Sequence, residues 1–547
     1  MTRIMKALTA GQTLVPMKHR SRYLVFFLVN FAMAIDKVNV TGAITSFYSL
    51  SQKFNASTAT VSWVLSVYAL TMGSFIVLFG KIGDIFGHHH TFVVGTFIMA
   101  IFSLLSAAVD ESIYAVIVFR AFQGIAGAAL IPSGFALAAN YFQGHERIIA
   151  LKILSSCSTG ALGLGVVIGG AFDETKIGYQ ALFYFTFAVS FLSGVLLYFV
   201  IIPVEKTEGH KNLSFKHLDF FGVFLMTSAL LLIIVGLTQA ATTWNSPSVY
   251  VTIPVGLLFL TGFFLFETVY IKQFKKKFQD SLPHDEKTSQ EKQDWRLNLQ
   301  VLFPAELLKI PNFYQLFFGI FLVNASFVCL QTNLVEYYEY IEFQSSLMAS
   351  IKILPLPAGT LAGSLLFTPK IIEKLTLRGS LIMVGVIGVV CSLWISRTDY
   401  TVHNYYWKFN FASQFLMGYV INMYFMVFLG GLMHNTPLHL QGVVSGFGQT
   451  VIQIGASVGT SLINSVIGNM DFEKGNETAR HHVAQKFQKS LYLVTGMMGV
   501  LTIAMLFVSN QKNFINNGEK ASQEEESVAI DNVSLDLESS IKKAEMV

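Results

Sequence analysis

Long apolar runs, separated by short polar breaks, constrain this chain more than any other feature of its sequence. Each run is long enough for a helix to cross the ~30 Å hydrocarbon core of a bilayer, which takes about 20 residues. The runs are continuous rather than alternating residue by residue, which favours spanning helices over a membrane β-barrel. We therefore expect an all-α polytopic membrane protein with about 14 transmembrane helices, near residues 22–48, 60–80, 89–109, 112–140, 148–172, 181–203, 218–239, 248–271, 313–337, 346–368, 380–397, 406–433, 443–468 and 490–510.

The composition excludes an ordinary soluble domain. Of 547 residues, 53% are hydrophobic and 13% are charged, against about 25% charged residues in soluble proteins. The three cysteines, Cys157, Cys329 and Cys391, fall inside apolar runs and predict neither a disulfide framework nor a metal site. The sequence has no glycine-rich nucleotide loop ending in Lys-Ser or Lys-Thr, and no acid pair or nucleophile with its base deep in the runs. We expect no enzymatic activity, no cofactor, no metal and no nucleic-acid partner.

The positions of basic residues predict the topology. Cytoplasmic loops are enriched in Lys and Arg, and an even number of spans returns the chain to its starting side. Basic residues precede the first run and follow the eighth, so both termini are expected in the cytoplasm. The first run is too long for the core of a cleavable signal peptide, and two glycosylation sequons, at Asn55 and Asn476, fall in loops expected outside. The basic residues are Arg3, Lys6, Lys18, Arg20, Arg22, Lys272, Lys275, Lys276 and Lys277.

A weak internal repeat predicts two halves. The segment Lys81–Asp84 after the second run is echoed by Lys370–Glu373 after the tenth, as two six-helix bundles would show, although chance similarity explains it equally well. The predicted units are a cytoplasmic N-terminus (1–21), an N-terminal six-helix bundle (22–203), two inserted helices with the preceding loop (204–271), a cytoplasmic linker (272–312), a C-terminal six-helix bundle (313–510) and a disordered cytoplasmic tail (511–547).

A glycine-rich polar segment, residues 80–90, joins the second and third runs. Its glycines would permit positive φ and close backbone approach in a tight turn, and a helix N-terminus would hold its aspartate. Three adjacent histidines, 88–90, do not converge on one metal ion from a regular backbone, so a loop at the membrane edge is expected. An arbitrary glycine-rich turn is the plain alternative. The residues expected to form this conformational loop are Gly80, Lys81, Gly83, Asp84 and Gly87.

Ionisable residues inside the first and fourth runs are the strongest functional candidates, because a charge in hydrocarbon costs at least ~2.5 kcal/mol without compensation. Arg120 needs a partner in the bundle, and an arginine that caps buried carbonyls is the alternative. Asp36 precedes Lys37 directly. Adjacent helix residues point about 100° apart, so we do not expect the two to pair face to face. Asp36 is expected to face a cavity, with a place near the outer edge as the alternative.

The second half has polar candidates of its own. Glu336, Glu339 and Glu342 cluster at the end of the ninth run, and Lys352 lies in the tenth. We expect Glu336 to pair with Lys352, and Glu339 and Glu342 to be solvated. Two amides four residues apart in the thirteenth run, Gln449 and Gln453, suit either a polar solute or a neighbouring helix. The fifth run is rich in glycines, which permit close helix approach; they are Gly165, Gly169 and Gly170.

The chain resembles the major facilitator superfamily in two signatures. Residues 80–87 match the family's loop after the second helix, although His88, His89 and His90 stand where Arg or Lys is usual. The segment Arg120-Ala121-Phe122-Gln123-Gly124 matches the family's fourth-helix signature. This resemblance implies a fold of two six-helix bundles, here with two inserted helices, and a role in proton coupling for Arg120 and its neighbour Gln123.

Within that superfamily the chain is similar to the fourteen-helix drug:proton antiporter family. Asp36 in the first run and Trp63 with Tyr68 in the second carry this likeness, which implies that they line the cavity. The fifth run resembles the antiporter signature, except that Val166 replaces the proline thought to bend this helix. The loop and the Arg120 segment look most like fungal members that include the aminotriazole and boron exporter and the low-affinity ammonium transporter.

These features predict a secondary active transporter that exports a drug or small toxic compound in exchange for protons. The alternatives are uptake of a small ion or solute such as ammonium, and a transporter-like nutrient sensor. The expected partners are the substrate, protons and the lipid bilayer, with the chain as a monomer. The resemblance implies the plasma membrane, with the vacuolar membrane as the alternative. The residues expected to couple protons to transport are Asp36, Arg120, Gln123, Glu336 and Lys352.

Overall fold

The computed structural model describes residues 16, 20–204, 217–240, 245–281, 299, 301–366, 370–434, 436, 438–468 and 477–509. Every predicted apolar run is helical there, and no strand occurs in these ranges, so the all-α expectation is confirmed. Most of the predicted N-terminus (1–21), part of the linker (272–312), the tail (511–547) and the sequon at Asn476 lie outside the described residues. The side chains of Lys370–Glu373 do too, so the internal repeat and the domain boundaries stay predictions.

The helices fall into three consecutive groups. The N-terminal half holds α2 (Arg22–Thr45), α3 (Phe47–Phe54), α4 (Thr58–Phe86), α5 (His88–Ala108), α6 (Ile113–Tyr141), α7 (Gly144–Asp173) and α8 (Gln180–Val200). The inserted group holds α9 (Phe220–Ala240), α10 (Pro247–Leu265), η5 (Phe266–Tyr270) and α11 (Ile271–Ser281). The C-terminal half holds η6 (Ala305–Lys309), α13 (Phe313–Glu336), η7 (Tyr337–Ile341), α14 (Ser346–Ile353), α15 (Pro355–Leu366), α16 (Lys370–Ile395), η8 (Tyr406–Asn410), α17 (Phe411–His434), α18 (Leu438–Ile467) and α19 (Glu477–Met505).

Thirteen helices among the described residues are long and apolar enough to cross a membrane. The fourteenth predicted run, 490–510, lies in α19, whose first half carries Glu477, Arg480 and Lys486 and is therefore more polar. α19 nevertheless packs against α13 and α16 within the C-terminal half. A membrane-spanning role for this last helix stays a prediction.

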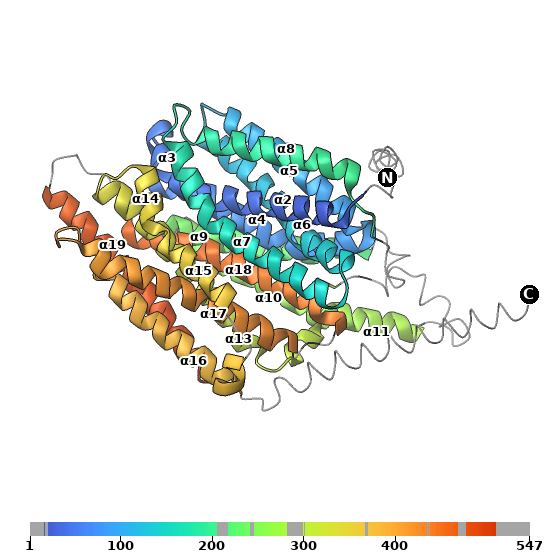
Figure 1. Ribbon diagram of the computed structural model, residues 1–547. Helices are drawn as coiled ribbons and strands as arrows, with labels where there is room; N and C mark the ends of the chain where they lie inside the picture. The colour runs from blue at the N-terminus through green and yellow to red at the C-terminus, as the bar shows by residue number, and fades with distance from the viewer. Residues whose placement is uncertain are drawn as a thin grey trace, which may run out of the picture.

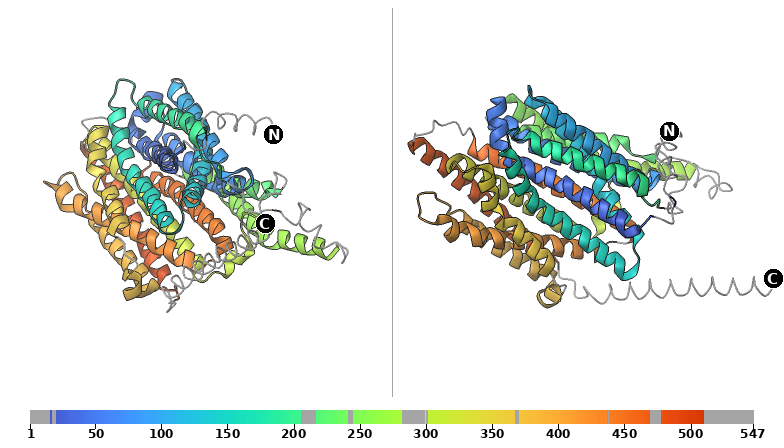
Figure 2. Two further views of the ribbon diagram at one scale, coloured as in Figure 1. Left: turned by 45° about the vertical axis from the view of Figure 1, so that its right-hand side comes forward. Right: turned by 45° about the horizontal axis from the view of Figure 1, so that its top comes forward.

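The helices run side by side in two bundles (Figures 1 and 2). In the N-terminal half, α2 packs on α7 and α4 on α6; in the C-terminal half, α15 packs on α17 and α13 on α18. α4 and α18 join the halves, because the Thr450 hydroxyl donates to the Gly73 carbonyl (2.8 Å) and the Ser457 hydroxyl to the Ser66 carbonyl (2.9 Å). The inserted pair α9 and α10 packs together, and α9 contacts both α4 and α18.

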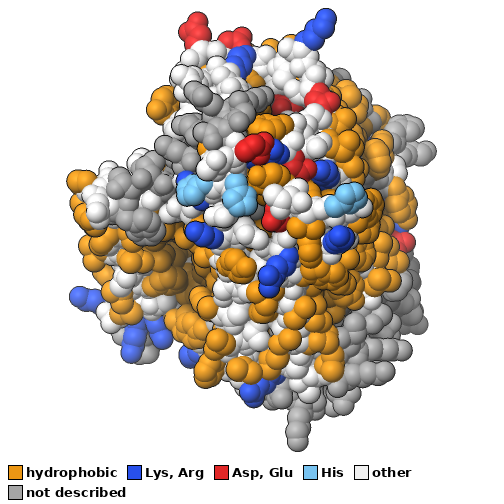
Figure 3. Space-filling view, turned by 90° about the vertical axis from the view of Figure 1, so that its left-hand side faces the viewer, with side chains coloured by type: hydrophobic (Ala, Val, Ile, Leu, Met, Phe, Trp, Pro, Cys, Tyr) orange, Lys and Arg blue, Asp and Glu red, His pale blue; other side chains and the backbone are white. Residues whose placement is uncertain are grey.

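The halves also meet at one end of the molecule, which we call the closed end. There the Ser346 hydroxyl at the start of α14 donates to Asp173 at the end of α7 (2.9 Å). The rings of Tyr48 and Tyr340 meet edge to face, with centroids 4.9 Å apart. Figure 3 views the molecule from this side: charged and histidine side chains lie on the central face, and hydrophobic side chains cover the flanks, as helices entering lipid require.

The segment predicted as a loop at residues 80–90 is mostly helix. α4 continues to Phe86, so four of the five predicted loop residues are helical, and Gly87 alone forms the turn, with φ of 98°. Asp84 lies in the last turn of α4, and its carboxylate contacts Nε2 of His88, the first residue of α5, at 3.1 Å. Isolated glycines lower helix stability but do not end a helix that is held by tertiary packing.

Prolines explain why the predicted single helix at 346–368 is divided into two helices. Pro355 and Pro357 lack the backbone N–H that an α-helix interior needs, and the run is divided into α14 and α15 at Leu354. Pro355 then stands at the first position of the new helix, where a missing N–H has no cost.

Candidate functional site

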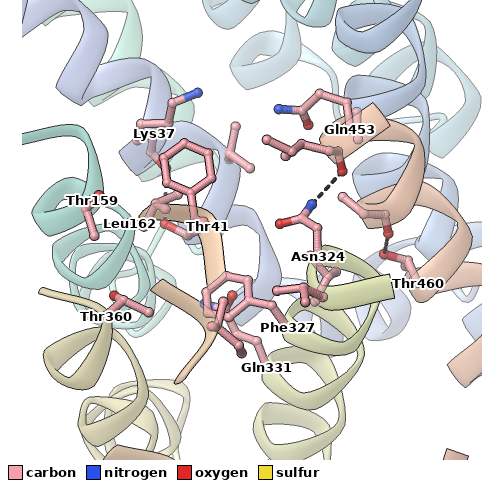
Figure 4. A pocket seen from close by; sticks show the side chains of 18 of the residues that line it. Lys37, Thr41, Thr159, Leu162, Asn324, Phe327, Gln331, Thr360, Gln453 and Thr460 are labelled. Atoms are coloured by element: carbon pink, nitrogen blue, oxygen red, sulfur yellow. Dashed lines mark hydrogen bonds between the residues drawn. The ribbon is translucent and has the colours of Figure 1, made fainter. Parts of the chain in front are cut away.

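A cavity of about 250 Å³ lies between the two halves. Its wall comes from α2, α4, α6 and α7 on one side and from α13, α15, α17 and α18 on the other. Gln449 and Gln453 line it, as predicted for a substrate cavity. Figure 4 shows Lys37 and Gln453 on opposite walls, and Asn324 between α18 and the cavity, where its amide donates to the Ile452 carbonyl.

Asp36 is buried beside the cavity rather than exposed to it. The Nζ atom of Lys37 lies 3.1 Å from Oδ2 of Asp36, and the Tyr68 hydroxyl donates to Oδ1. The expectation that adjacent residues do not pair is wrong, because the flexible lysine chain folds back to its neighbour. Lys37, not Asp36, is the residue that lines the cavity. α6 approaches closely at Gly127, where a Cβ would meet both the Tyr68 hydroxyl and Asp36.

Arg120 is fully buried and lines the cavity. Its Nε donates to the Val64 carbonyl (3.1 Å) and its Nη1 to Oε1 of Gln123 (2.9 Å). The guanidinium lies over the ring of Tyr68, 4.6 Å from the centroid. Its Nη2 has no hydrogen-bond partner among the described residues. Arg120 therefore caps a carbonyl and an amide, and the described residues give it no directly bonded acid.

Gln123 connects three helices of the N-terminal half. Its side-chain oxygen accepts from Arg120 and from Nδ2 of Asn39 (2.9 Å), and its amide donates to the Phe102 carbonyl (3.1 Å) and the Ser106 hydroxyl (2.9 Å). Gln123 does not line the cavity; it holds Arg120 in place. Sequence reasoning missed Asn39 and Ser106 as members of this network, although both are polar residues inside apolar runs.

The aromatic residues predicted in the cavity lie elsewhere. Tyr68 is buried and binds Asp36, so its hydroxyl is used within the N-terminal half. Trp63 packs partly buried against the hydrophobic core. Neither belongs to the cavity wall, and the correction follows from helix rotation: α4 turns Leu65 and Ala69 to the cavity instead.

The acidic residues of the C-terminal half also differ from expectation. Lys352 pairs with Glu342, not with Glu336, and its ammonium lies over the ring of Tyr338, 5.1 Å from the centroid. Burial raises the pKa of Glu342, and Lys352 opposes that shift. The π-helical turn η7 and the short link after it bring Glu342 back over α14, which the sequence did not reveal. Glu339 is buried rather than solvated.

Glu336 is buried and isolated in the described part of the chain. It is 0% exposed, and neither carboxylate oxygen has a hydrogen-bond partner among the described residues. An ionised carboxylate without a partner is costly in such a place. Glu336 does not line the cavity, and lies one helical turn or more beyond the lining residue Gln331 on the same helix.

The glycines of α7 have two separate functions. A Cβ at Gly165 or Gly169 would meet the backbone of α2, at Val38 and Gly42 respectively, so these two hold the N-terminal half together. A Cβ at Gly170 would meet Ser346 and Ser350 of α14, in the other half. The predicted close packing is present. Two of the glycines pack within the N-terminal half, and the third packs against the C-terminal half at the closed end.

The comparisons with known proteins agree with this architecture. Residues 24–460 match the model of the Major Facilitator Superfamily. The chain is 24% identical to the tetracenomycin C resistance and export protein of Streptomyces glaucescens, over 77% of this chain and 71% of that protein. It is 28% identical to the low affinity ammonium transporter of Saccharomyces cerevisiae, over 43% of this chain and 47% of that protein.

Among solved structures, the chain is similar to a bacterial homologue of the human lysosomal transporter Spinster, in an inward-facing and unoccupied conformation. The TM-score is 0.61 at 13% identity, covering 89% of this chain and 96% of the other, which shows the fold. The family model, the helical bundles and the cavity between them lead to one conclusion: the chain belongs to the Major Facilitator Superfamily and is a membrane transporter.

Proposed function

We propose that the protein is a proton-coupled secondary transporter that exports a small solute. The observation that carries this proposal is the buried contact of Asp36 with Lys37 and Tyr68, directly beside a cavity that both halves line. The similarity to a resistance and export protein supports export as the direction. The similarity to an ammonium transporter makes uptake of a small ion the second candidate.

The proton would act at Asp36. The ionised carboxylate binds the Lys37 ammonium, which lines the cavity. Protonation of Asp36 removes the charge that holds Lys37, so the ammonium is released toward the cavity. A proton thereby changes the charge that a solute meets, which is the differential interaction that alternating access requires. Arg120, held by Gln123, keeps the neighbouring wall positively charged in both states. Glu336 is a second candidate proton site, because its buried carboxylate has no hydrogen-bond partner among the described residues.

The closed end is proposed to be the outer face of the membrane. The exposed sequon residue Asn55 lies at this end, after α3, and α11, which carries Lys272, Lys275, Lys276 and Lys277, lies at the opposite end (Figure 1). In this arrangement both termini are cytoplasmic, and export proceeds when the contact between Gly170 and α14 separates. We further propose a monomer in the plasma membrane, with the vacuolar membrane as the alternative. The loop residues at 80–87 would act on the cytoplasmic side.

The test is solute flux in proteoliposomes with an imposed pH gradient. A strain that lacks or overexpresses the protein is first challenged with a panel of toxic solutes, and one that shows a phenotype is used for the flux assay. The wild-type protein should accumulate the solute only when the gradient is present. Asp36→Asn should retain binding and lose the gradient's effect. Flux that ignores the pH gradient in the wild type, or that keeps its dependence in Asp36→Asn, would refute the coupling proposal.

A further inference from the structure

The charges around the cavity do not balance. Two basic side chains, Lys37 and Arg120, line it, and no acidic side chain does so among the described residues of its wall. Asp36 lies behind the wall and is already bound to Lys37 and Tyr68. One carboxylate therefore stands against two cations, in a part of the chain where an uncompensated charge is costly.

Arg120 leaves a specific hydrogen-bonding group unused. Its Nε and Nη1 atoms donate within the protein, while Nη2 has no partner among the described residues although the side chain is fully buried. A buried donor without an acceptor is unfavourable, and a guanidinium binds oxyanions through just such N–H groups. The partner that Nη2 lacks is thus an acceptor that carries negative charge, and Arg120 lines the cavity.

The opposite wall offers neutral hydrogen-bond donors and acceptors. The C-terminal half contributes amides to the lining, and Oδ1 of Asn422 has no hydrogen-bond partner among the described residues. Such groups suit the uncharged remainder of a solute. The cavity of about 250 Å³ is slightly smaller than the ~300–1,000 Å³ typical of drug-sized pockets, which favours a small molecule. The lining amides are Asn324, Gln331, Asn422, Gln449 and Gln453.

We propose that the solute is a small organic anion, whose negatively charged group binds Lys37 and Arg120 while its other end contacts the amides of the C-terminal half. This assignment rests on the proposed function and names its substrate class. A cation at the same place would meet two like charges and no acid on the wall, because Asp36 is held by Lys37. Ammonium and cationic drugs are therefore disfavoured as solutes of this cavity.

The test uses three probes of the same shape and different charge: benzoate, benzamide and benzylammonium. Binding to the purified full-length protein in detergent is followed by intrinsic fluorescence, which needs neither a membrane nor a pH gradient. Benzoate should bind, and the other two should bind at least about tenfold more weakly, since one of them loses the charge and the other reverses it. Tighter binding of benzylammonium, or equal binding of all three, would overturn the proposal.

Three variants at two positions place the site. Lys37→Met should weaken benzoate binding at least about tenfold, and Lys37→Arg should restore most of it, because the charge is kept. The second cation is tested by Arg120→Lys, because a neutral residue at this buried position would endanger folding. Lys53→Met removes an exposed lysine at the closed end and is the matched control. If Lys37→Met folds and its benzoate binding is unchanged, the proposed site is refuted.

The outcome separates this inference from the proposed function. If benzoate binds through Lys37 but flux in proteoliposomes ignores the pH gradient, the anion site holds and the proton coupling fails. If gradient-driven flux is found for a cationic or neutral solute alone, the coupling holds and the anion assignment fails.

Discussion

The N-terminal half brings charge to the cavity, whereas the C-terminal half brings neutral amides. Lys37 and Arg120 come from α2 and α6, and Gln449 and Gln453 come from α18. The C-terminal half keeps its buried charges farther away, in the Lys352–Glu342 pair near the closed end and in Glu336. A wall with two cations therefore stands opposite a wall of neutral hydrogen-bonding groups, and in the two proposals above the first binds the solute's charge and the second its uncharged part.

The sharpest way to break this comparison is to remove the charge from the N-terminal wall. Lys37→Met should reduce flux to the level of empty vesicles, because the cavity loses a cation that lines it. Gln453→Leu, on the opposite wall, should retain transport. Flux is normalised to folded protein in the membrane. Equal loss in both variants would show that the two walls do not differ in this way.

The second test concerns the contact between the halves. Gly170→Leu should prevent close approach of α7 to α14 and reduce flux by at least about tenfold, since a side chain there meets Ser346 and Ser350. Gly160→Leu, on the same helix, is the matched control, because a Cβ at Gly160 has nothing within 4 Å. Flux by both variants is compared at equal amounts of inserted protein. Similar activity would mean that the closed end does not need this contact.

The third test concerns the Lys352–Glu342 pair of the C-terminal half. Lys352→Met leaves the buried carboxyl of Glu342 unpaired, and should lower the free energy of unfolding by ~1–3 kcal/mol. Burial raises the pKa of Glu342 in the folded state, so its protonated form is favoured there and stability falls as pH rises through that value. Removing Lys352 removes the opposing influence, so the loss should be larger in mildly alkaline than in mildly acidic buffer.

Thermal unfolding of Lys352→Met, Glu342→Gln and the double variant measures this coupling. The double variant should recover part of the stability that Lys352→Met loses. An identical loss at both pH values would contradict the assigned cause.

The smallest expected effect of a single substitution on the solute-binding wall is at Gln453. Gln453→Leu should raise KM by about threefold to tenfold with kcat nearly unchanged, as expected when one neutral hydrogen bond to the solute is lost. Initial rates of flux over a range of solute concentrations give both constants. A fall in kcat with an unchanged KM would place Gln453 in the conformational change rather than in binding.

The exposed pair at the closed end should matter least. The hydrogen bond from Lys53 lowers the pKa of Asp110, so any stability that it adds is present above the ordinary pKa of Asp110 and is lost as pH falls toward the lowered value. Because solvent screens this exposed pair, Lys53→Met should change thermal unfolding little even at neutral pH, where any such contribution is fully present. A clear destabilisation there would show that this exposed pair holds the closed end together.

The sequence by itself determined the helices and the family. Apolar runs bounded by polar breaks predict spanning helices because lipid leaves the backbone no other partners, and each run is helical in the structure. The Arg120 signature also identified a fully buried cation that lines the cavity. These inferences succeed because they depend on local composition and on short segments of contiguous sequence.

Only the tertiary structure decided which side chains meet. Helical spacing gives the face of a residue but not the rotation of the helix or its neighbour, so Lys37 rather than Asp36 lines the cavity and Trp63 does not. Lys352 pairs with Glu342 because η7 changes the direction of the chain before α14. Long flexible side chains and packed helix pairs set these contacts, and their energies depend on residues far apart in sequence.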